Sequence, residues 1–164
     1  MTGRIHIAPP RDAADHEAIA GLVREYAGSL GFSLDYQGFE AELADLAAKY
    51  APPGGALLLA RVDGSAAGTV ALRQLGPGIG EMKRLYVRPD FRKERTESGD
   101  SIGRVLAHRI VDAARACGHR RLRLDTIGPK MEAAIKLYHS MGFVEISPYY
   151  PSPVPGTVYM ELVL

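Results

Sequence analysis

The 164-residue chain has a single cysteine, Cys117, which excludes an internal disulfide framework and a multi-cysteine zinc site. Its five histidines are scattered, and none stands at metal-ligand spacing from another. Twenty basic side chains nearly cancel nineteen acidic ones, and a net charge of +1 provides no basic field for nucleic acid. No apolar run approaches the ~20 residues that cross a bilayer, and the N-terminus lacks the apolar core of a signal peptide. We therefore expect a soluble, cytoplasmic protein without metal, nucleic-acid or membrane partners.

What is present is a mixed succession of helix and strand patterns that fits one domain, residues 1–164. Strands are predicted at 4–8, 56–61, 68–72, 80–87, 121–125 and 158–164, and helices at about 13–30, 39–50, 101–117 and 129–141. Asp63-Gly64 predicts a tight hairpin turn, and the proline-rich segment 147–156 cannot join a sheet. The order β-α-α-β-β-β-α-β-α-β predicts an α/β (α+β) domain with a mixed central sheet flanked by helices.

Three segments carry a family resemblance. A strand ending in Leu85-Tyr86-Val87-Arg88-Pro89 leads to a loop with Gly99-Asp100-Ser101-Ile102-Gly103, and a helix follows. Further along, Leu137-Tyr138 precedes Gly142-Phe143 at the end of another helix. Together these segments resemble the GNAT superfamily of N-acetyltransferases, which use acetyl-CoA. The resemblance implies direct, metal-free acetyl transfer, in a ternary complex, to a primary amine of a small molecule or peptide.

The resemblance also assigns a binding site for coenzyme A. A helix N-terminus presents free backbone N–H groups that bind pyrophosphate, and the helix beginning near Ser101 is placed for this. In the family, the pantetheine arm pairs with the strand before this loop. The residues assigned to the cofactor are Leu85, Tyr86, Val87, Arg92, Ser98, Gly99, Asp100, Ser101, Ile102, Gly103, Arg104 and Ala134.

The phosphate loop departs from the family pattern of Arg or Gln, two residues, Gly, one residue, then Gly or Ala. Either Ser98 and Ser101 replace the first two motif residues, or Arg92 is the motif arginine and the loop is lengthened. Residues 92–100 carry three basic and three acidic side chains, which brings negative charge toward a phosphate site. A non-catalytic acyl-CoA-binding or regulatory module with a degenerate phosphate loop is therefore the alternative to an enzyme.

Two residues are candidates for acid–base chemistry. The departing thiolate benefits from a proton donor, and the resemblance gives this role to Tyr138, whose alternative is a core tyrosine. Glu81 is the candidate general base, and strand alternation places it on one face with Lys83, Leu85 and Val87. Its alternative is a strand-end carboxylate paired with a neighbouring cation. A purely binding module needs neither Tyr138 nor Glu81.

The acceptor amine is not specified by any motif. Candidate substrate contacts are Tyr36, Arg84, Tyr149 and Tyr150. Asp125 and Thr126 end a strand beside the cofactor cleft, where capping of a turn is an equally good role. By analogy with the family, a homodimer formed through a terminal strand is compatible with this sequence.

Overall fold

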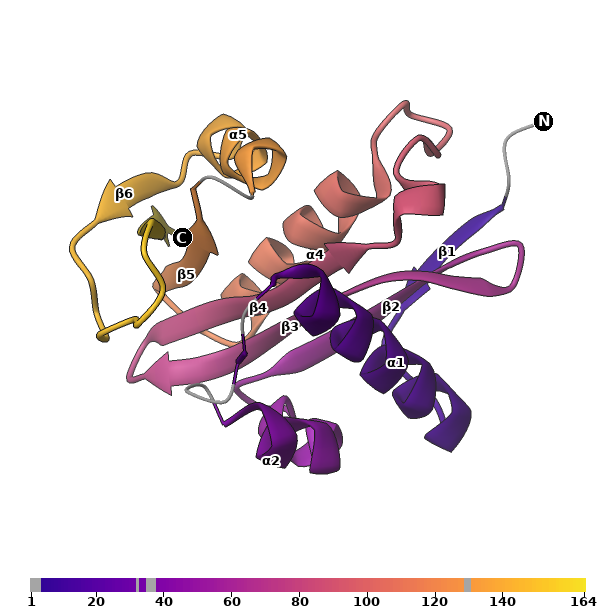
Figure 1. Cartoon of the computed structure of the whole chain (residues 1–164), viewed down its shortest axis with the longest axis horizontal. Coiled ribbons are helices and arrows are strands. Elements are labelled where there is room, and N and C mark those ends of the chain that lie inside the picture. Colours follow the sequence, from indigo (N-terminus) through magenta and orange to yellow (C-terminus); the bar gives the residue numbers. More distant parts are fainter. Residues whose placement is uncertain (1–3, 32, 35–37, 129–130) are drawn as a thin grey trace.

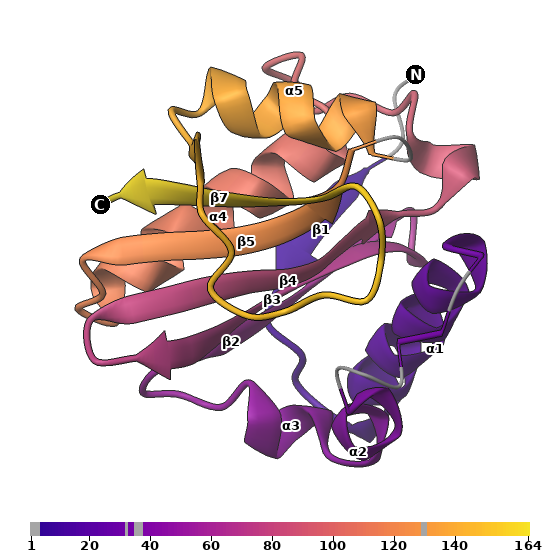
Figure 2. The same cartoon turned by 60° about the vertical axis from the view of Figure 1, so that its left-hand side comes forward.

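The computed structural model describes residues 4–31, 33–34, 38–128 and 131–164. Within these ranges, seven strands form one mixed sheet in the order β1-β2-β3-β4-β5-β7-β6, with helices on both faces (Figure 1, Figure 2). The strands are β1 (Ile5–Ala8), β2 (Ala56–Val62), β3 (Ser65–Gly76), β4 (Ile79–Val87), β5 (Arg121–Ile127), β6 (Val144–Ile146) and β7 (Thr157–Val163). The helices are α1 (Ala13–Ser29), α2 (Phe39–Ala44), α3 (Leu46–Lys49), α4 (Ile102–Ala116) and α5 (Glu132–Ser140), with a short 3-10 helix, η2 (Pro89–Phe91). The predicted mixed sheet flanked by helices is confirmed.

Strands β1 to β4 form an antiparallel meander, and β4 then runs parallel to β5. The β2–β3 hairpin turns at Asp63 and Gly64, whose φ angles of +48° and +85° fit the left-handed turn that this dipeptide favours. Strand β7 lies antiparallel between β5 and β6, so the C-terminal strand is internal to the sheet. The only parallel neighbours among the described strands are β4 and β5, at the centre of the sheet.

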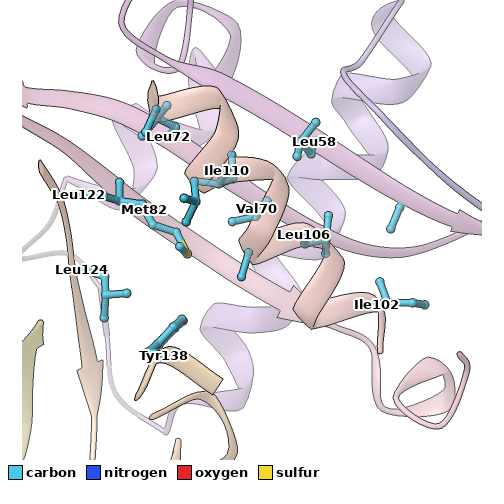
Figure 3. Packing of buried hydrophobic residues seen from close by; sticks show 14 of the residues in the cluster. Leu58, Val70, Leu72, Met82, Ile102, Leu106, Ile110, Leu122, Leu124 and Tyr138 are labelled. Carbon is cyan, nitrogen blue, oxygen red and sulfur yellow. The ribbon is translucent and has the colours of Figure 1, made fainter. Parts of the chain in front are cut away.

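Two apolar layers sandwich the sheet. On one face, α4 and α5 pack against β2 to β5, and Figure 3 shows Ile102, Leu106 and Ile110 of α4 directed at the strands. These three side chains recur every four residues, so they line one helix face, and each is at most 1% exposed. Ser101 begins the helix, because its Oγ accepts a hydrogen bond from the Arg104 N–H at 3.2 Å. On the opposite face, α1 to α3 cover β2 to β4.

Two elements differ from the prediction. The helix expected at 39–50 is divided at Asp45, whose φ of −148° leaves the helical region and whose carboxylate accepts from Ala48 N–H. Strand β6 was not predicted, since three residues are too short to display alternation. Pro129, expected in the first turn of the last helix, lies outside the described residues.

Neither a membrane-spanning helix nor a cluster of metal-ligating side chains occurs in the described parts of the chain. None of the helices there is both long and apolar enough to cross a bilayer. No group of three histidine, cysteine or acidic side chains there is arranged to hold a metal ion.

Candidate active site

One extra residue in β4 opens the centre of the sheet. Strand β4 pairs with β5 only from Ile79 to Glu81, whereas β5 pairs with β7 along its whole length. On its other side, the register of β4 with β3 shifts so that Arg84 and Leu85 together stand opposite Val70. Arg84 has a φ of +61°, and a bulge of this kind bends and twists the strand that carries it. The second half of β4 therefore diverges from β5.

A cavity of about 290 Å³ lies in this opening. It is walled by β4, β5, α1, α5 and the segment that follows β4. Its lining residues are Tyr26, Ser29, Leu30, Met82, Lys83, Arg84, Leu85, Tyr86, Val87, Arg92, Leu124, Asp125, Thr126, Met131, Ala133, Ala134 and Tyr138. Seven of the predicted site residues are thus brought around one space: Arg84, Leu85, Tyr86, Val87, Arg92, Ala134 and Tyr138.

The divergent half of β4 presents an open backbone edge to the cavity. In the described chain, Leu85, Tyr86 and Val87 pair with no strand on the β5 side. Arg92 lies at the far end of this edge, where its Nε donates a hydrogen bond to the Val87 carbonyl at 2.9 Å. A Cβ on Gly103 would lie 3.8 Å from Val87 Cγ2, so the first turn of α4 adjoins the same end. The edge therefore leads from the cavity to a helix N-terminus.

The loop between β4 and α4 contains an additional turn. Arg95 and Ser101 form a bridge, and Thr96 N–H donates to the Asp100 carbonyl at 2.9 Å. Ser101 and Gly103 occupy the junction with α4, while Arg92 stays beside β4, so this turn lies between them. None of Ser98, Gly99, Asp100, Ser101, Ile102, Gly103 and Arg104 lines the cavity.

Asp100 supplies negative charge at this helix N-terminus. Its carboxylate lies 3.6 Å from the Arg104 guanidinium and accepts a hydrogen bond from Ser98 Oγ at 3.0 Å. Both charged side chains of the pair are more than 40% exposed. An incoming anion would therefore compete with Asp100 for Arg104.

Tyr138 lies where α5 crosses the opening. The side chain is 6% exposed and lines the cavity, and its ring packs 5.6 Å from that of Phe143. Gly142, with a φ of +99°, ends the helix and allows Phe143 to turn back onto it. Burial raises the pKa of the Tyr138 phenol, which therefore keeps its proton at neutral pH. The ring thus belongs to the core and borders the cavity at the same time.

Glu81 occupies the last position of β4 that pairs with β5. Its carboxylate accepts a hydrogen bond from Arg73 Nε at 2.7 Å and another from the Tyr149 hydroxyl at 2.6 Å, and Lys83 Nζ lies 3.9 Å away. The residue is 1% exposed and is absent from the cavity lining. Its neighbours are therefore those of a buried ion pair.

The predicted common face for Glu81, Lys83, Leu85 and Val87 is wrong. Lys83 lies beside Glu81, but Leu85 and Val87 pack with the apolar layer under α4. The bulge adds a residue between Lys83 and Leu85, and this reverses the alternation for the rest of the strand.

Asp125 provides a second carboxylate, directly on the cavity wall. Its Oδ2 accepts a hydrogen bond from the Tyr150 hydroxyl at 2.7 Å. Burial raises the pKa of Asp125, while the hydrogen bond from Tyr150 and the charge of Lys83 act in the opposite direction. Burial also lowers the pKa of Lys83, which lines the same wall. A site role and a turn-capping role are equally good for Asp125 on sequence alone, and the structure places its side chain on the cavity wall.

Arg84, predicted to contact substrate, is engaged within the protein. Its Nε and Nη2 donate to the two carboxylate oxygens of Glu42 in α2 at 2.9 and 2.8 Å. Glu42 also accepts from Lys49 Nζ at 3.2 Å. Arg84 therefore connects the bulge to α2, and its guanidinium lies 5.6 Å from the ring of Phe39 in the same helix.

The remaining predicted substrate contacts come from different places. Tyr149 and Tyr150 belong to the proline-rich loop, which passes in front of β4 and β5 in Figure 2. Their hydroxyls donate hydrogen bonds to Glu81 and Asp125, respectively, and neither tyrosine lines the cavity. Tyr36 lies outside the described residues. Several lining residues were not predicted as site residues, among them Ser29 and Met131, because isolated small or apolar side chains give no signal.

Known proteins resemble this chain in sequence and in fold. The acetyltransferase (GNAT) family model matches residues 21–143. An uncharacterised N-acetyltransferase of Schizosaccharomyces pombe is 40% identical over 155 residues, covering 93% of this chain and 89% of that protein. Among solved structures, an acetyltransferase from Streptococcus agalactiae superposes with a TM-score of 0.77 at 20% identity, with 98% of each chain covered.

A further solved structure carries a ligand. A proposed acetyltransferase of Salmonella typhimurium, solved with its cofactor acetyl-CoA, has a TM-score of 0.66 at 20% identity, covering 97% of this chain and 93% of that one. The family model and the fission-yeast relative both extend over most of the chain, including the opened sheet and α5. This chain therefore belongs to the GNAT family of acetyltransferases.

Proposed function

We propose that the protein transfers the acetyl group of acetyl-CoA directly to a primary amine of a small molecule or peptide, with both substrates bound together. The observation that carries this proposal is the open edge of β4 beside a cavity that Tyr138 lines. An extended molecule with amide groups can pair with such an edge as an added strand would. The pantetheine arm of coenzyme A has this chemistry, and the backbone of Leu85, Tyr86 and Val87 would hold it.

The far end of the edge suits the pyrophosphate. Partial positive charge and free N–H groups at the start of α4 attract an anion, and Ile102 and Gly103 lie in that first turn. Arg92 adds a full positive charge beside Val87. Acetyl-CoA supplies an acetyl group already activated as a thioester. The residues present thus fit the cofactor along its length, although Asp100 opposes its phosphates.

Tyr138 is proposed as the general acid. A thiol has a pKa of about 8.5, so a departing thiolate is a stable leaving group that gains further from a nearby proton donor. The buried phenol keeps its proton at neutral pH and lines the cavity. Deprotonation of the acceptor amine needs a base, and two carboxylates lie beside the opening. Glu81 stays our sequence-based candidate, and Asp125 is the one on the cavity wall.

The proposal is tested by measuring release of coenzyme A from acetyl-CoA with a panel of acceptors. The panel contains ethanolamine, the amino acids, spermidine, kanamycin and a lysine-containing peptide. Calorimetry with acetyl-CoA alone measures binding separately. We expect tight binding and transfer to at least one class of amine. Binding without transfer to any amine would instead favour the acyl-CoA-binding module, and absence of binding would contradict both functions.

A further inference from the structure

The two carboxylates at the opening differ in what surrounds them. Both oxygens of Glu81 are occupied, Oε1 by Arg73 and Oε2 by Tyr149. Asp125 accepts one hydrogen bond, at Oδ2 from Tyr150, and among the described residues Oδ1 accepts none. Asp125 also lines the cavity, whereas Glu81 does not. A proton arriving from a molecule in the cavity therefore has direct access to Asp125 alone of the two.

Building on the proposed acetyl transfer, we propose that Asp125 is the catalytic base that takes the proton of the acceptor ammonium, and that Tyr150 positions it. The ammonium form of the amine gives one proton to Asp125 Oδ1, and the freed nitrogen lone pair forms the N–C bond to the acetyl carbon. The C–S bond breaks as the electron pair passes to sulfur. Sulfur takes a proton from Tyr138, and the second amine proton leaves to solvent as the amide forms.

The charges around Asp125 are consistent with this role. Lys83, Arg84 and Glu81 face it from β4, Tyr138 from α5, and Tyr149 and Tyr150 from the proline-rich loop. Lys83 and Arg84 favour the ionised carboxylate, whereas Glu81 and burial favour the protonated acid. This balance keeps the carboxyl available both to bind a cation and to receive its proton.

The adjacent tyrosines provide a matched pair of variants. Tyr150→Phe removes the hydrogen bond to Asp125 and leaves that to Glu81, whereas Tyr149→Phe does the reverse. A hydrogen bond to a carboxylate stabilises its ionised form, so losing it raises the pKa of that carboxyl. The two substitutions therefore remove the same chemical group from different carboxylates, and only Tyr150→Phe removes the hydrogen bond that lowers the pKa of Asp125.

The experiment measures kcat against pH for the panel acceptor with the highest kcat/KM. We expect Asp125→Asn to lower kcat by roughly 100-fold or more and to remove the acidic limb of the profile. Tyr150→Phe should move that limb to higher pH by about one unit, and Tyr149→Phe should leave its position unchanged. A limb that moves in Tyr149→Phe and stays fixed in Tyr150→Phe would overturn the proposal and assign the base to Glu81.

Two further measurements separate the ways in which the proposal can fail. Carboxyl ¹³C NMR of aspartate-labelled protein follows the titration of Asp125 directly, and a limb that does not follow this titration would also overturn the assignment. Calorimetry with acetyl-CoA shows whether each variant is folded and binds. Failure of the wild-type protein to transfer acetyl to any amine would remove the proposed function itself. Transfer that survives in Asp125→Asn with its acidic limb intact would remove only the role of Asp125.

Discussion

Tyr149 and Tyr150 are adjacent in the chain, yet their hydroxyls donate hydrogen bonds to carboxylates on two different strands. Tyr149 reaches Glu81 on β4 at 2.6 Å, and Tyr150 reaches Asp125 on β5 at 2.7 Å. Their rings lie 5.5 Å apart, edge to face, and both contact Tyr159 of β7. The proline-rich loop thus connects β4 and β5 at the level where their own pairing ends.

Replacing Tyr138 with phenylalanine should leave acetyl-CoA binding unchanged and lower kcat. Removal of a general acid costs roughly 100-fold or more, while the ring and its packing against Phe143 remain. Steady-state kinetics and calorimetry measure the two effects. Tyr50→Phe is the matched control, because it removes a buried hydroxyl outside this cavity. Unchanged turnover in Tyr138→Phe would remove this tyrosine from the mechanism.

Gly68→Ala should weaken acetyl-CoA binding. Gly68 pairs with Val87, and a Cβ at position 68 would lie 2.9 Å from the Tyr86 carbonyl oxygen, so β4 must move. Such overpacking costs about 1–3 kcal/mol of stability and displaces the open edge. Gly21→Ala in α1, where no atom lies within 4 Å, is the control and should gain about 0.5–1 kcal/mol. Calorimetric Kd values equal to wild type in Gly68→Ala would contradict the proposed pairing at this edge.

Asp100→Asn should tighten acetyl-CoA binding by about threefold, because a half-exposed charge is worth up to about 1 kcal/mol. The substitution removes negative charge from the residue just before the N-cap of α4 and frees Arg104 for an anion. The gain should shrink as salt is added. Asp112→Asn, which breaks the exposed pair with Arg115 on the same helix, should have no effect on the Kd. Weaker binding in Asp100→Asn would show that the phosphates do not approach this turn.

Arg84→Met should destabilise the fold by about 3–5 kcal/mol. The substitution keeps a long side chain at the bulge but leaves the fully buried Glu42 carboxylate with Lys49 as its one remaining ion-pair partner among the described residues. Urea unfolding gives the difference in free energy. The double variant Glu42→Gln with Arg84→Met should recover part of the loss, since no unpaired charge remains buried. Equal stabilities of the single variant and the wild type would contradict this account.

Glu42 should also make the protein acid-sensitive. Burial alone would raise its pKa, but the hydrogen bonds and charge of Arg84, with Lys49, lower it from 4.5 to about 2. A depressed folded-state pKa stabilises the protein fully above pH 4.5, and this contribution of about 3 kcal/mol is lost as the pH falls toward 2. Urea unfolding at pH 7 and pH 3 should therefore show a smaller loss for Glu42→Gln than for wild type. Glu40→Gln, an exposed change on the same helix, should behave as wild type.

The order of elements could be predicted because apolar spacing, caps and turns are local. Asp63-Gly64 and Ser101 are examples in which one or two residues determine a boundary. The bulge could not be predicted in the same way. Arg84, with its positive φ, bonds to Glu42 in a distant helix and stands with Leu85 opposite Val70, and neither relationship is visible along β4. The error in the faces of Leu85 and Val87 follows directly from that residue.

In the candidate site, too, residues within a local motif could be predicted, and residues placed by tertiary contacts could not. Side chains carried by a motif, such as Tyr138 and Tyr86, were identified and do lie together. Asp125 could not be separated from a turn-capping residue, because its partner Tyr150 is 25 residues away in the chain. Met131 lines the cavity because of its place in the fold, and it belongs to no motif that the sequence displays. Tertiary pairing, which is absent from any local pattern, decides these cases.

The divergence of β4 from β5 leaves part of an interior strand with unpaired backbone groups. An exposed strand edge ordinarily invites another protein chain to add to the sheet, which is a route to aggregation. In this fold the edge lies between α1 and α5 with cationic side chains, Lys83 and Arg92, at either end. A folded strand with neighbours of its own would have to displace these walls to reach the edge, whereas a single extended chain would need only the space of the cavity. The same walls that shape the cavity should therefore protect the protein from associating through its own opened sheet.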